Sequence, residues 1–172
     1  MAFKELAVKR YSVRKFKTDP VEKEKLDLVL EAIRSAPTAA NQQPQRVLVV
    51  TSEEGLRKMD AVTPCRFGAP AVLLMCFDKS KAWVRPTDKA DSGLVDASIA
   101  ATQAMLQAAD IGLGTTWVMF FDTAKAREEF NLGANLVPVA VLPLGYPADD
   151  ALPAAFHTQR QPLENIAAFE HF

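Results

Sequence analysis

The segment from Gly93 to Ile111 constrains the fold most, because it is a long helical pattern whose apolar positions are unusually small. The small residues recur at helical spacing and are Ala97, Ala100, Ala101, Ala104, Ala108 and Ala109. Small side chains let another helix approach closely, so this helix is predicted to lie centrally and also to contribute to a subunit interface. Gly112 is the expected left-handed residue just beyond its end.

Apolar strand patterns and helix patterns are interspersed along the rest of the chain. The predicted strands cover residues 46–51, 70–77, 115–121 and 137–144. The predicted helices include a short one at the start of the chain and three that begin at the N-cap residues Asp19, Ser52 and Asp122, the first followed by Pro20. Pro138 and Pro143 remove backbone donors, so they are expected at the ends of the last strand or on a sheet edge.

Two segments lack such patterns. Residues 78–92 are polar and are read as a surface loop with limited helix. Residues from about 147 onward are proline-rich and predict an extended C-terminal arm. A chain of 172 residues with this mixed order predicts one domain over residues 1–172, with an α+β or α/β three-layer sandwich fold.

Composition narrows the classes of partner. The hydrophobic fraction of 49% is ordinary for a globular protein, and a net charge of −1 gives no reason to expect nucleic acid or an anionic membrane. The sequence has neither a signal-peptide pattern nor an apolar run of transmembrane length, so a cytoplasmic protein is expected. Cys65 and Cys76 have no spacing typical of a disulfide framework or a zinc site.

An alternating basic stretch, Arg10-Tyr11-Ser12-Val13-Arg14, comes shortly before the first long helix. In an extended segment every second side chain shares a face, so Arg10, Ser12 and Arg14 can converge on one anion while Tyr11 and Val13 pack behind them. Arginine suits a phosphate because its planar guanidinium makes bidentate, charge-assisted hydrogen bonds. A solvated basic strand is the alternative interpretation.

Two further stretches carry small residues and amides. Residues 35–44, Ser-Ala-Pro-Thr-Ala-Ala-Asn-Gln-Gln-Pro, lie between a predicted helix and a predicted strand. Residues 112–117, Gly-Leu-Gly-Thr-Thr-Trp, follow the alanine-rich helix. Each has a purely structural alternative, because amides stabilise their own turns and glycine ends helices.

These stretches in this order resemble the nitroreductase family of FMN-dependent oxidoreductases. The matching features are the R-x-S-x-R of residues 10–14, the A-P-T-A-x-N-x-Q-P that begins at Ala36, the G-L-G-T-x-W of residues 112–117, and Leu-Gly-Tyr-Pro at 144–147 followed by Arg160. The resemblance implies a nitroreductase fold, with a mixed sheet flanked by helices, and an intertwined homodimer that holds FMN at the subunit interface. Thr158 departs from the lysine that many members have near the C-terminal arginine, and whether His157 replaces that lysine stays open.

The resemblance also implies roles for single residues. Arg10, Ser12, Arg14 and Arg160 are assigned to the flavin phosphate and ribityl chain, and Tyr11 is counted with them. The backbone around Pro37 and Thr38, together with Asn41, is assigned to the isoalloxazine end. Backbone N–H groups at Gly114 and Thr115 are expected near the flavin N5 atom.

The sequence offers no obvious side-chain acid, base or nucleophile, since His157 and His171 both lie near the C-terminal end. This pattern agrees with flavin chemistry, in which the protein supplies orientation and electrostatics. The expected activity is ping-pong hydride transfer from NAD(P)H through FMN to a small-molecule acceptor such as a nitroaromatic or quinone. A non-catalytic flavin-storage protein and a colourless interaction domain are the alternatives, and neither the physiological acceptor nor the choice between NADH and NADPH can be read from the sequence.

Overall fold

A four-stranded sheet of order β1-β2-β4-β3 forms the middle of the computed structural model, which describes residues 2–171. The strands are β1 (Gln45–Val50), β2 (Ala71–Asp78), β3 (Gly114–Thr115) and β4 (Leu136–Gly145). Neighbouring strands pair antiparallel, and a parallel bridge between Ser12 and Thr115 adds the basic opening segment beside β3. The four strands therefore form an antiparallel sheet, and the predicted mixed sheet is present only in this isolated parallel bridge.

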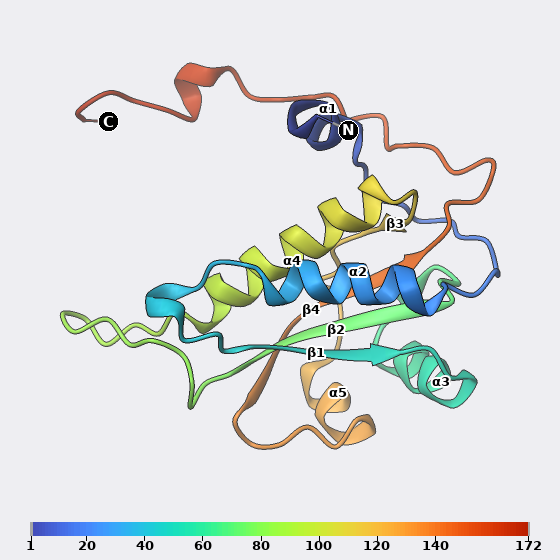
Figure 1. The fold of residues 1–172 in the computed structure, drawn as a ribbon, viewed down its shortest axis with the longest axis horizontal. Coiled ribbons are helices and arrows are strands. Elements are labelled where there is room, and N and C mark those ends of the chain that lie inside the picture. Colours follow the sequence, from blue (N-terminus) through green and yellow to red (C-terminus); the bar gives the residue numbers. More distant parts are fainter. Residues whose placement is uncertain (1, 172) are drawn as a thin grey trace.

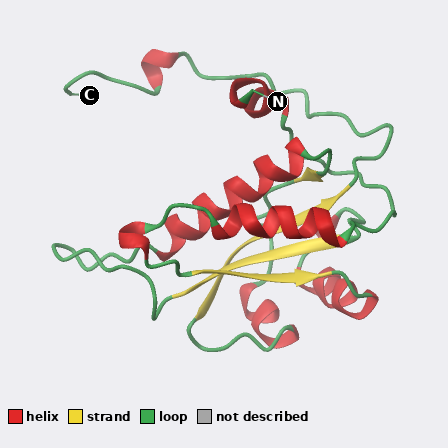
Figure 2. Cartoon of the chain, in the orientation of Figure 1, coloured by secondary structure: helices red, strands yellow, loops and turns green. Residues whose placement is uncertain are grey.

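Helices cover both faces of this sheet (Figures 1 and 2). Helices α2 (Lys23–Arg34) and α4 (Gly93–Asp110) lie on one face, and α3 (Glu53–Val62) and α5 (Thr123–Glu129) lie on the other. The short helix α1 (Phe3–Lys9) lies beyond the C-terminal end of α4. The predicted α+β three-layer architecture is confirmed.

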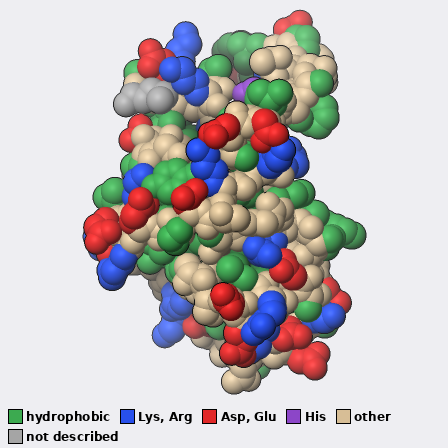
Figure 3. Space-filling model, turned by 90° about the vertical axis from the view of Figure 1, so that its right-hand side faces the viewer, with side chains coloured by type: hydrophobic (Ala, Val, Ile, Leu, Met, Phe, Trp, Pro, Cys, Tyr) green, Lys and Arg blue, Asp and Glu red, His purple; other side chains and the backbone are tan. Residues whose placement is uncertain are grey.

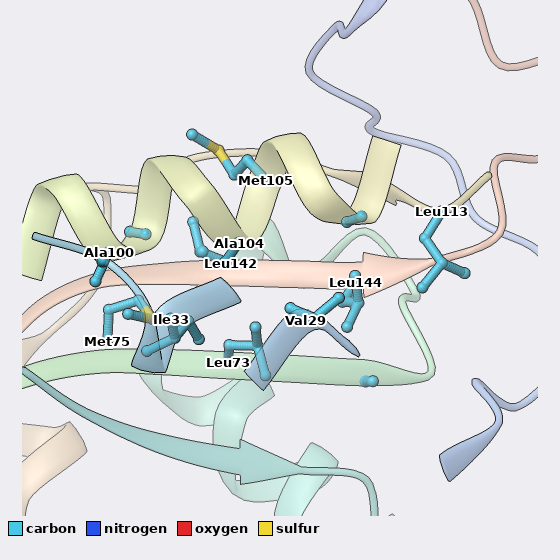
Figure 4. Close-up of a cluster of buried hydrophobic side chains, with 14 residues drawn as sticks. Val29, Ile33, Leu73, Met75, Ala100, Ala104, Met105, Leu113, Leu142 and Leu144 are labelled. Carbon is cyan, nitrogen blue, oxygen red and sulfur yellow. The ribbon is translucent and has the colours of Figure 1, made fainter. Parts of the chain in front are cut away.

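Strand β2 supplies both apolar layers, because its side chains alternate between the two faces. Leu73 and Met75 pack with Val29 and Ile33 of α2 and with the alanines of α4 (Figure 4). On the other face, side chains of β2 pack with Met59 and Val62 of α3 and with Ala126 of α5. A strand buried on both faces is an almost continuous apolar run, and β2 has that sequence.

The small residues of α4 face inward, as the sequence predicted. Ala100, Ala101, Ala104 and Ala108 are fully buried against α2 and the sheet. Three larger side chains of the same helix are exposed, Leu94, Val95 and Ile99, whereas Met105 is buried with the alanines. The central position of the helix is confirmed, and its outward apolar stripe is the surface that the predicted subunit interface would use.

Three local predictions at helix ends are also confirmed. The Ser52 hydroxyl accepts a hydrogen bond from the Gly55 N–H (3.1 Å), and the Asp122 carboxylate accepts one from the Lys125 N–H (2.9 Å). Gly112 has a φ of 81°, and the Leu113 N–H donates to the Ala108 carbonyl (2.8 Å), which is the bonding of a Schellman end.

The predicted start of α2 is wrong, since the helix begins at Lys23 with Glu22 as its N-cap and not at Asp19 and Pro20. Residues 17–22 are held instead by the end of β4. The Lys17 N–H donates to the Tyr146 carbonyl (2.9 Å), and the Tyr146 hydroxyl donates to the Glu22 carboxylate (2.6 Å). These contacts between distant residues hold the segment in place before the helix begins.

The predicted strand over residues 115–121 is also wrong, because β3 ends at Thr115 and pairing resumes only at Val118, opposite Val141. Pro143 explains the gap. Alternate residues of an antiparallel strand direct their N–H groups to the same neighbour, and Val141 exchanges two 3.0 Å bonds with Val118. Pro143 comes two residues after Val141, so its backbone faces the same neighbouring segment. As a proline it has no N–H to donate to that segment, and the pairing is interrupted there. Its strand is central in the sheet, so the expectation of an edge position is not met.

Residues 79–92 form a narrow antiparallel ribbon, where the sequence had indicated a loop with limited helix. Val84 pairs with Asp91, the Arg85 N–H donates to the Ala90 carbonyl (2.8 Å), and the Ser92 N–H donates to the Trp83 carbonyl (2.8 Å). The ribbon projects beside the N-terminal end of α4 (Figure 1).

Beyond Pro147 the chain runs over α1 and then away from the sheet (Figure 1). Over residues 148–171 its regular structure is a single turn of 3-10 helix at Leu163–Asn165. Large apolar side chains along it are exposed: Leu152, Phe156, Leu163, Ile166 and Phe169. Figure 3 shows hydrophobic side chains next to acidic and basic ones over this upper part of the molecule, and interspersed charged side chains below it. Within residues 2–171 no helix has the length and apolarity needed to cross a membrane.

Candidate functional site

The basic opening segment is fixed to the sheet by one backbone bond and one buried side chain. The Val13 N–H donates to the Thr115 carbonyl (3.0 Å), and the Val13 side chain is 1% exposed. Arg14 next to it is exposed, and its Nη1 donates to the Ser12 carbonyl (3.3 Å). Alternation thus buries Val13 and leaves Arg10, Ser12 and Arg14 at least partly accessible, as an anion site requires.

Gly114 permits this close approach. A Cβ atom at position 114 would lie 2.5 Å from Cγ2 of Val13 and 3.1 Å from Cγ of Pro147. Real Cβ atoms do not come so close to other atoms, so any larger residue would push the opening segment away from β3. The glycine is required here for space, next to the residues assigned to the phosphate.

A hollow of about 170 Å³ lies between α1, the end of α4 and the opening segment. Its lining includes Arg10, Tyr11, Gly114 and Thr115. Thr115 is 2% exposed, and among residues 2–171 its hydroxyl oxygen has no hydrogen-bond partner. A buried hydroxyl without a partner, in a hollow that Arg10 also lines, suits a ligand oxygen, so these residues fit the phosphate and ribityl part of FMN. The hollow is smaller than the usual pocket of a whole cofactor, so only one end of the molecule fits it.

The arm is attached to this region at several points. The Tyr11 hydroxyl donates to the Ala151 carbonyl (3.3 Å), and a ring nitrogen of His157 lies 3.2 Å from the Val8 carbonyl. Arg160 follows on the same side of the molecule, where its Nη1 donates to the carbonyls of His157 (2.5 Å) and Gln159 (2.7 Å). The structure therefore brings the arm to the opening segment, while Arg160 bonds within the arm.

Two ion pairs strengthen the same attachment. Lys15 pairs with Asp150, and Lys17 pairs with Asp149 (2.6 Å). The hydrogen bond from Lys15 lowers the pKa of the Asp150 carboxyl, and the hydrogen bond with Asp149 raises the pKa of Lys17. A carboxyl with a lowered pKa stabilises the folded state above its unfolded pKa, and this contribution is lost as the pH falls through the folded pKa.

The amide-bearing turn around Thr38 lies elsewhere. The Thr38 hydroxyl accepts a hydrogen bond from the Gln43 N–H (3.0 Å), which closes the turn, and Pro37 and Asn41 are exposed. Asn41 has a φ of 54°, and Ala40 and Gln43 are also left-handed, at 49° and 51°. Such conformations are uncommon for residues other than glycine and mark a turn held by its surroundings.

The two candidate regions stand at opposite ends of α4 (Figure 1). The Ala39 N–H donates to Asp96 in the first turn of the helix, whereas Gly114 and Thr115 follow its last turn. A helix of 18 residues is about 27 Å long at 1.5 Å per residue. Within one chain the arginine segment and the amide turn are therefore separated by about the length of this helix.

Asp96 is the functional candidate that the sequence interpretation missed. It lies among alanines on the inward face of α4 and is 2% exposed. One feature of the sequence could have indicated this residue. Asp96 comes four residues before Ala100, and residues four apart share a helix face, so Asp96 is a carboxylate on the face that the small residues form.

Side chains that perform acid–base or nucleophilic chemistry are not prominent around these regions. Cys76 is buried in the sheet, and burial raises the pKa of its thiol to about 11, so it stays protonated at neutral pH. Within residues 2–171 no group of three or more His, Cys, Asp or Glu side chains is arranged to hold a metal ion. The regions therefore offer hydrogen-bond donors and positive charge for binding and orientation.

The fold and these two regions define an α+β protein with an arginine-bearing binding segment and a separate amide turn at the two ends of one central helix. The chain belongs to the nitroreductase family, whose model matches residues 7–66 and 63–146.

Similar proteins support the same assignment. A nitroreductase family protein of Clostridium difficile 630 superposes with a TM-score of 0.93 at 40% identity, with 100% of both chains covered. An FMN-dependent nitroreductase of Clostridium difficile R20291 superposes with a TM-score of 0.79 at 28% identity, over 97% of this chain and 98% of that one. FMN reductase [NAD(P)H] of Bacillus subtilis strain 168 is 31% identical over 80% of this chain and 63% of its own length, so the chain spans less than two thirds of that relative.

Proposed function

We propose that this protein is an FMN-dependent oxidoreductase that transfers hydride from NAD(P)H to a small acceptor such as a nitroaromatic or a quinone by a ping-pong mechanism. Family membership supports the flavin, and the names of the relatives, an FMN reductase [NAD(P)H] and an FMN-dependent nitroreductase, support the cofactor and the reductant. The observation that carries the proposal is the hollow beside β3, which Arg10 lines together with Thr115, whose buried hydroxyl has no hydrogen-bond partner among the described residues and suits an anionic ligand.

The residues of the chain have binding and orienting roles in this proposal. Arg10 and Arg14 bind the phosphate with charge-assisted hydrogen bonds, and the Ser12 and Thr115 hydroxyls bind neighbouring oxygens. Asn41 and the backbone at Pro37 and Thr38 orient the ring from the other side. When bound, FMN supplies the ring that accepts and returns hydride, so NAD(P)H and the acceptor use the same face in turn.

A second copy of the chain brings the two regions together. The exposed apolar stripe of α4, which includes Leu94, Val95 and Ile99, is suited to pack against the same stripe of a partner across a twofold axis. If the contact continues along the outward face past Thr102 to Leu106, so that the helices cross near the middle of α4, antiparallel packing places the start of one helix beside the end of the other. The arginine segment of each chain then faces the amide turn of its partner, and we infer a homodimer with two composite sites.

Replacing Arg14 tests the phosphate assignment. Arg14→Ala should weaken FMN binding by about tenfold or more, because a hydrogen bond to a charged group contributes roughly 1.5–3 kcal/mol. Isothermal titration of the apoprotein measures the dissociation constant. Lys58→Ala, which removes an exposed ion pair with Glu54 on α3, is the matched control and should bind as the wild type does. An unchanged constant for Arg14→Ala would remove Arg14 from the site.

Reduction by nicotinamides tests the activity itself. The purified protein, reconstituted with FMN, should be yellow and should bleach when NADH or NADPH is added without oxygen. A nitroaromatic or quinone added afterwards should restore the colour. A yellow protein that neither nicotinamide bleaches would instead be a flavin-storage protein, and failure to bind FMN would leave an interaction domain.

A further inference from the structure

A buried carboxylate connects α4 to the amide turn. Asp96 is 2% exposed, and its two oxygens bind different groups: Oδ2 accepts a hydrogen bond from the Ser92 hydroxyl (2.6 Å), and Oδ1 accepts one from the Ala39 N–H (2.9 Å). Burial of a polar or charged group is unfavourable unless it is hydrogen-bonded, so these two bonds are required where Asp96 sits.

The bond to Ala39 is not needed to begin the helix. The N-terminal amide of α4 at Gly93 already donates to the Asp91 carboxylate (2.9 Å). The Asp96 carboxylate bonds instead to a residue 57 positions earlier in the chain. Its contact with the turn is therefore a tertiary connection.

The turn that it holds has an unfavourable backbone. Ala40, Asn41 and Gln43 are left-handed non-glycine residues, a conformation that persists only where surrounding contacts enforce it. The turn is fixed at both ends: Asp96 binds the Ala39 N–H, and the Thr38 hydroxyl binds the Gln43 N–H. Asn41, assigned to the flavin ring, lies between these two bonds.

We propose that Asp96 is a positioning residue, which holds the turn of residues 39–43, with Ala40, Asn41 and Gln43 left-handed, so that the ring-facing half of the site is preformed before the flavin binds. The proposal rests on the proposed function for the identity of the ligand. Its structural part, the order of the turn in the apoprotein, does not depend on any ligand.

Hydrogen exchange of the apoprotein tests the structural part. Asp96→Ala should speed amide exchange across residues 39–43 by about tenfold, the factor that corresponds to loss of one hydrogen bond to a charged group. Asp96→Asn should stay near the wild type, because its oxygen still accepts from Ala39 and its amide can donate to Ser92. Asp122→Ala, which removes the cap of α5, is the matched control and should speed exchange only in α5.

A second variant removes the same bond from the donor side. Ala39→Pro deletes the N–H that Asp96 accepts, and Thr38 already has the extended backbone that precedes a proline (φ −137°, ψ 156°). Ala39→Pro should therefore also speed exchange at residues 40–43, even if Asp96→Ala fails to fold. Exchange in both variants equal to that of the wild type would overturn the proposal.

A comparison of FMN with riboflavin tests the link to the site, because riboflavin has the ring but not the phosphate. Asp96→Ala should weaken both ligands by the same factor, about tenfold, and leave the ratio of their dissociation constants unchanged. Arg14→Ala should change that ratio, because it acts on the phosphate alone. A changed ratio in Asp96→Ala would contradict the positioning role, whereas absence of FMN binding by the wild type would contradict the proposed function and leave the exchange result standing.

Discussion

A heterodimer of one Arg10→Glu chain and one Asn41→Trp chain is expected to regain about half of the wild-type FMN content and NAD(P)H oxidation per dimer, although each parental homodimer should be nearly inactive. Arg10→Glu places a negative charge beside the flavin phosphate. Asn41→Trp fills the space at the ring end. In the heterodimer both substitutions fall in one composite site, so the other site has only wild-type residues. One intact site out of two gives half of the wild-type FMN content and activity per dimer.

Coexpression with two different tags and tandem purification isolates this heterodimer. Flavin absorbance gives the FMN content, and the decrease of nicotinamide absorbance gives the rate. A heterodimer that carries both substitutions on the same chain and none on its partner is the matched control, and it should have no intact site if sites are shared. Activity in that control, together with an inactive mixed heterodimer, would show that each chain builds its own site.

Aspartates on the outward stripe of α4 are expected to convert the dimer to monomers and to abolish FMN binding. Val95 and Ile99 are one helical turn apart and exposed in the single chain, so Val95→Asp with Ile99→Asp should leave the folded monomer largely intact. In the dimer the same positions would bury charges without partners, which is strongly unfavourable. The loss of flavin follows because a monomer holds only half of each site.

Light scattering at low micromolar concentration measures the mass, and circular dichroism checks that the variant is folded. The wild type should have twice the monomer mass. Aspartates at Ala124 and Lys125 on α5, on the opposite side of the sheet, are the control pair and should leave both mass and flavin unchanged. A folded monomer that binds FMN with wild-type affinity would overturn both the interface and the shared sites.

Features that depend on neighbouring residues could be predicted from the sequence. The caps at Ser52 and Asp122 and the left-handed Gly112 follow from short-range hydrogen bonds, and the inward alanines of α4 follow from helical periodicity. The wrong predictions concern helix and strand boundaries that contacts with distant residues determine. Tyr146 holds Glu22 ahead of α2, and Pro143 interrupts the pairing of β3 from another strand.

In the candidate site, too, local features could be predicted from the sequence and long-range ones could not. Alternation predicted a buried Val13 between accessible arginines, and the structure has Val13 buried and Arg10 and Arg14 at least partly accessible, while their role in binding stays a prediction. The distance between that segment and Asn41 could not be predicted, since it depends on the direction in which α4 crosses the sheet. The role of Asp96 was missed for a related reason: its partner, Ala39, is near only in three dimensions.

In the proposed dimer, the placement of the two half-sites at opposite ends of α4 would couple cofactor loading to protein concentration. A ligand that binds only the assembled form stabilises that form by mass action. FMN would then lower the concentration at which chains associate, and dilution of the apoprotein would weaken apparent flavin affinity without any change in the residues that contact it. Cellular supply of the flavin would in this way set how much of the protein is assembled.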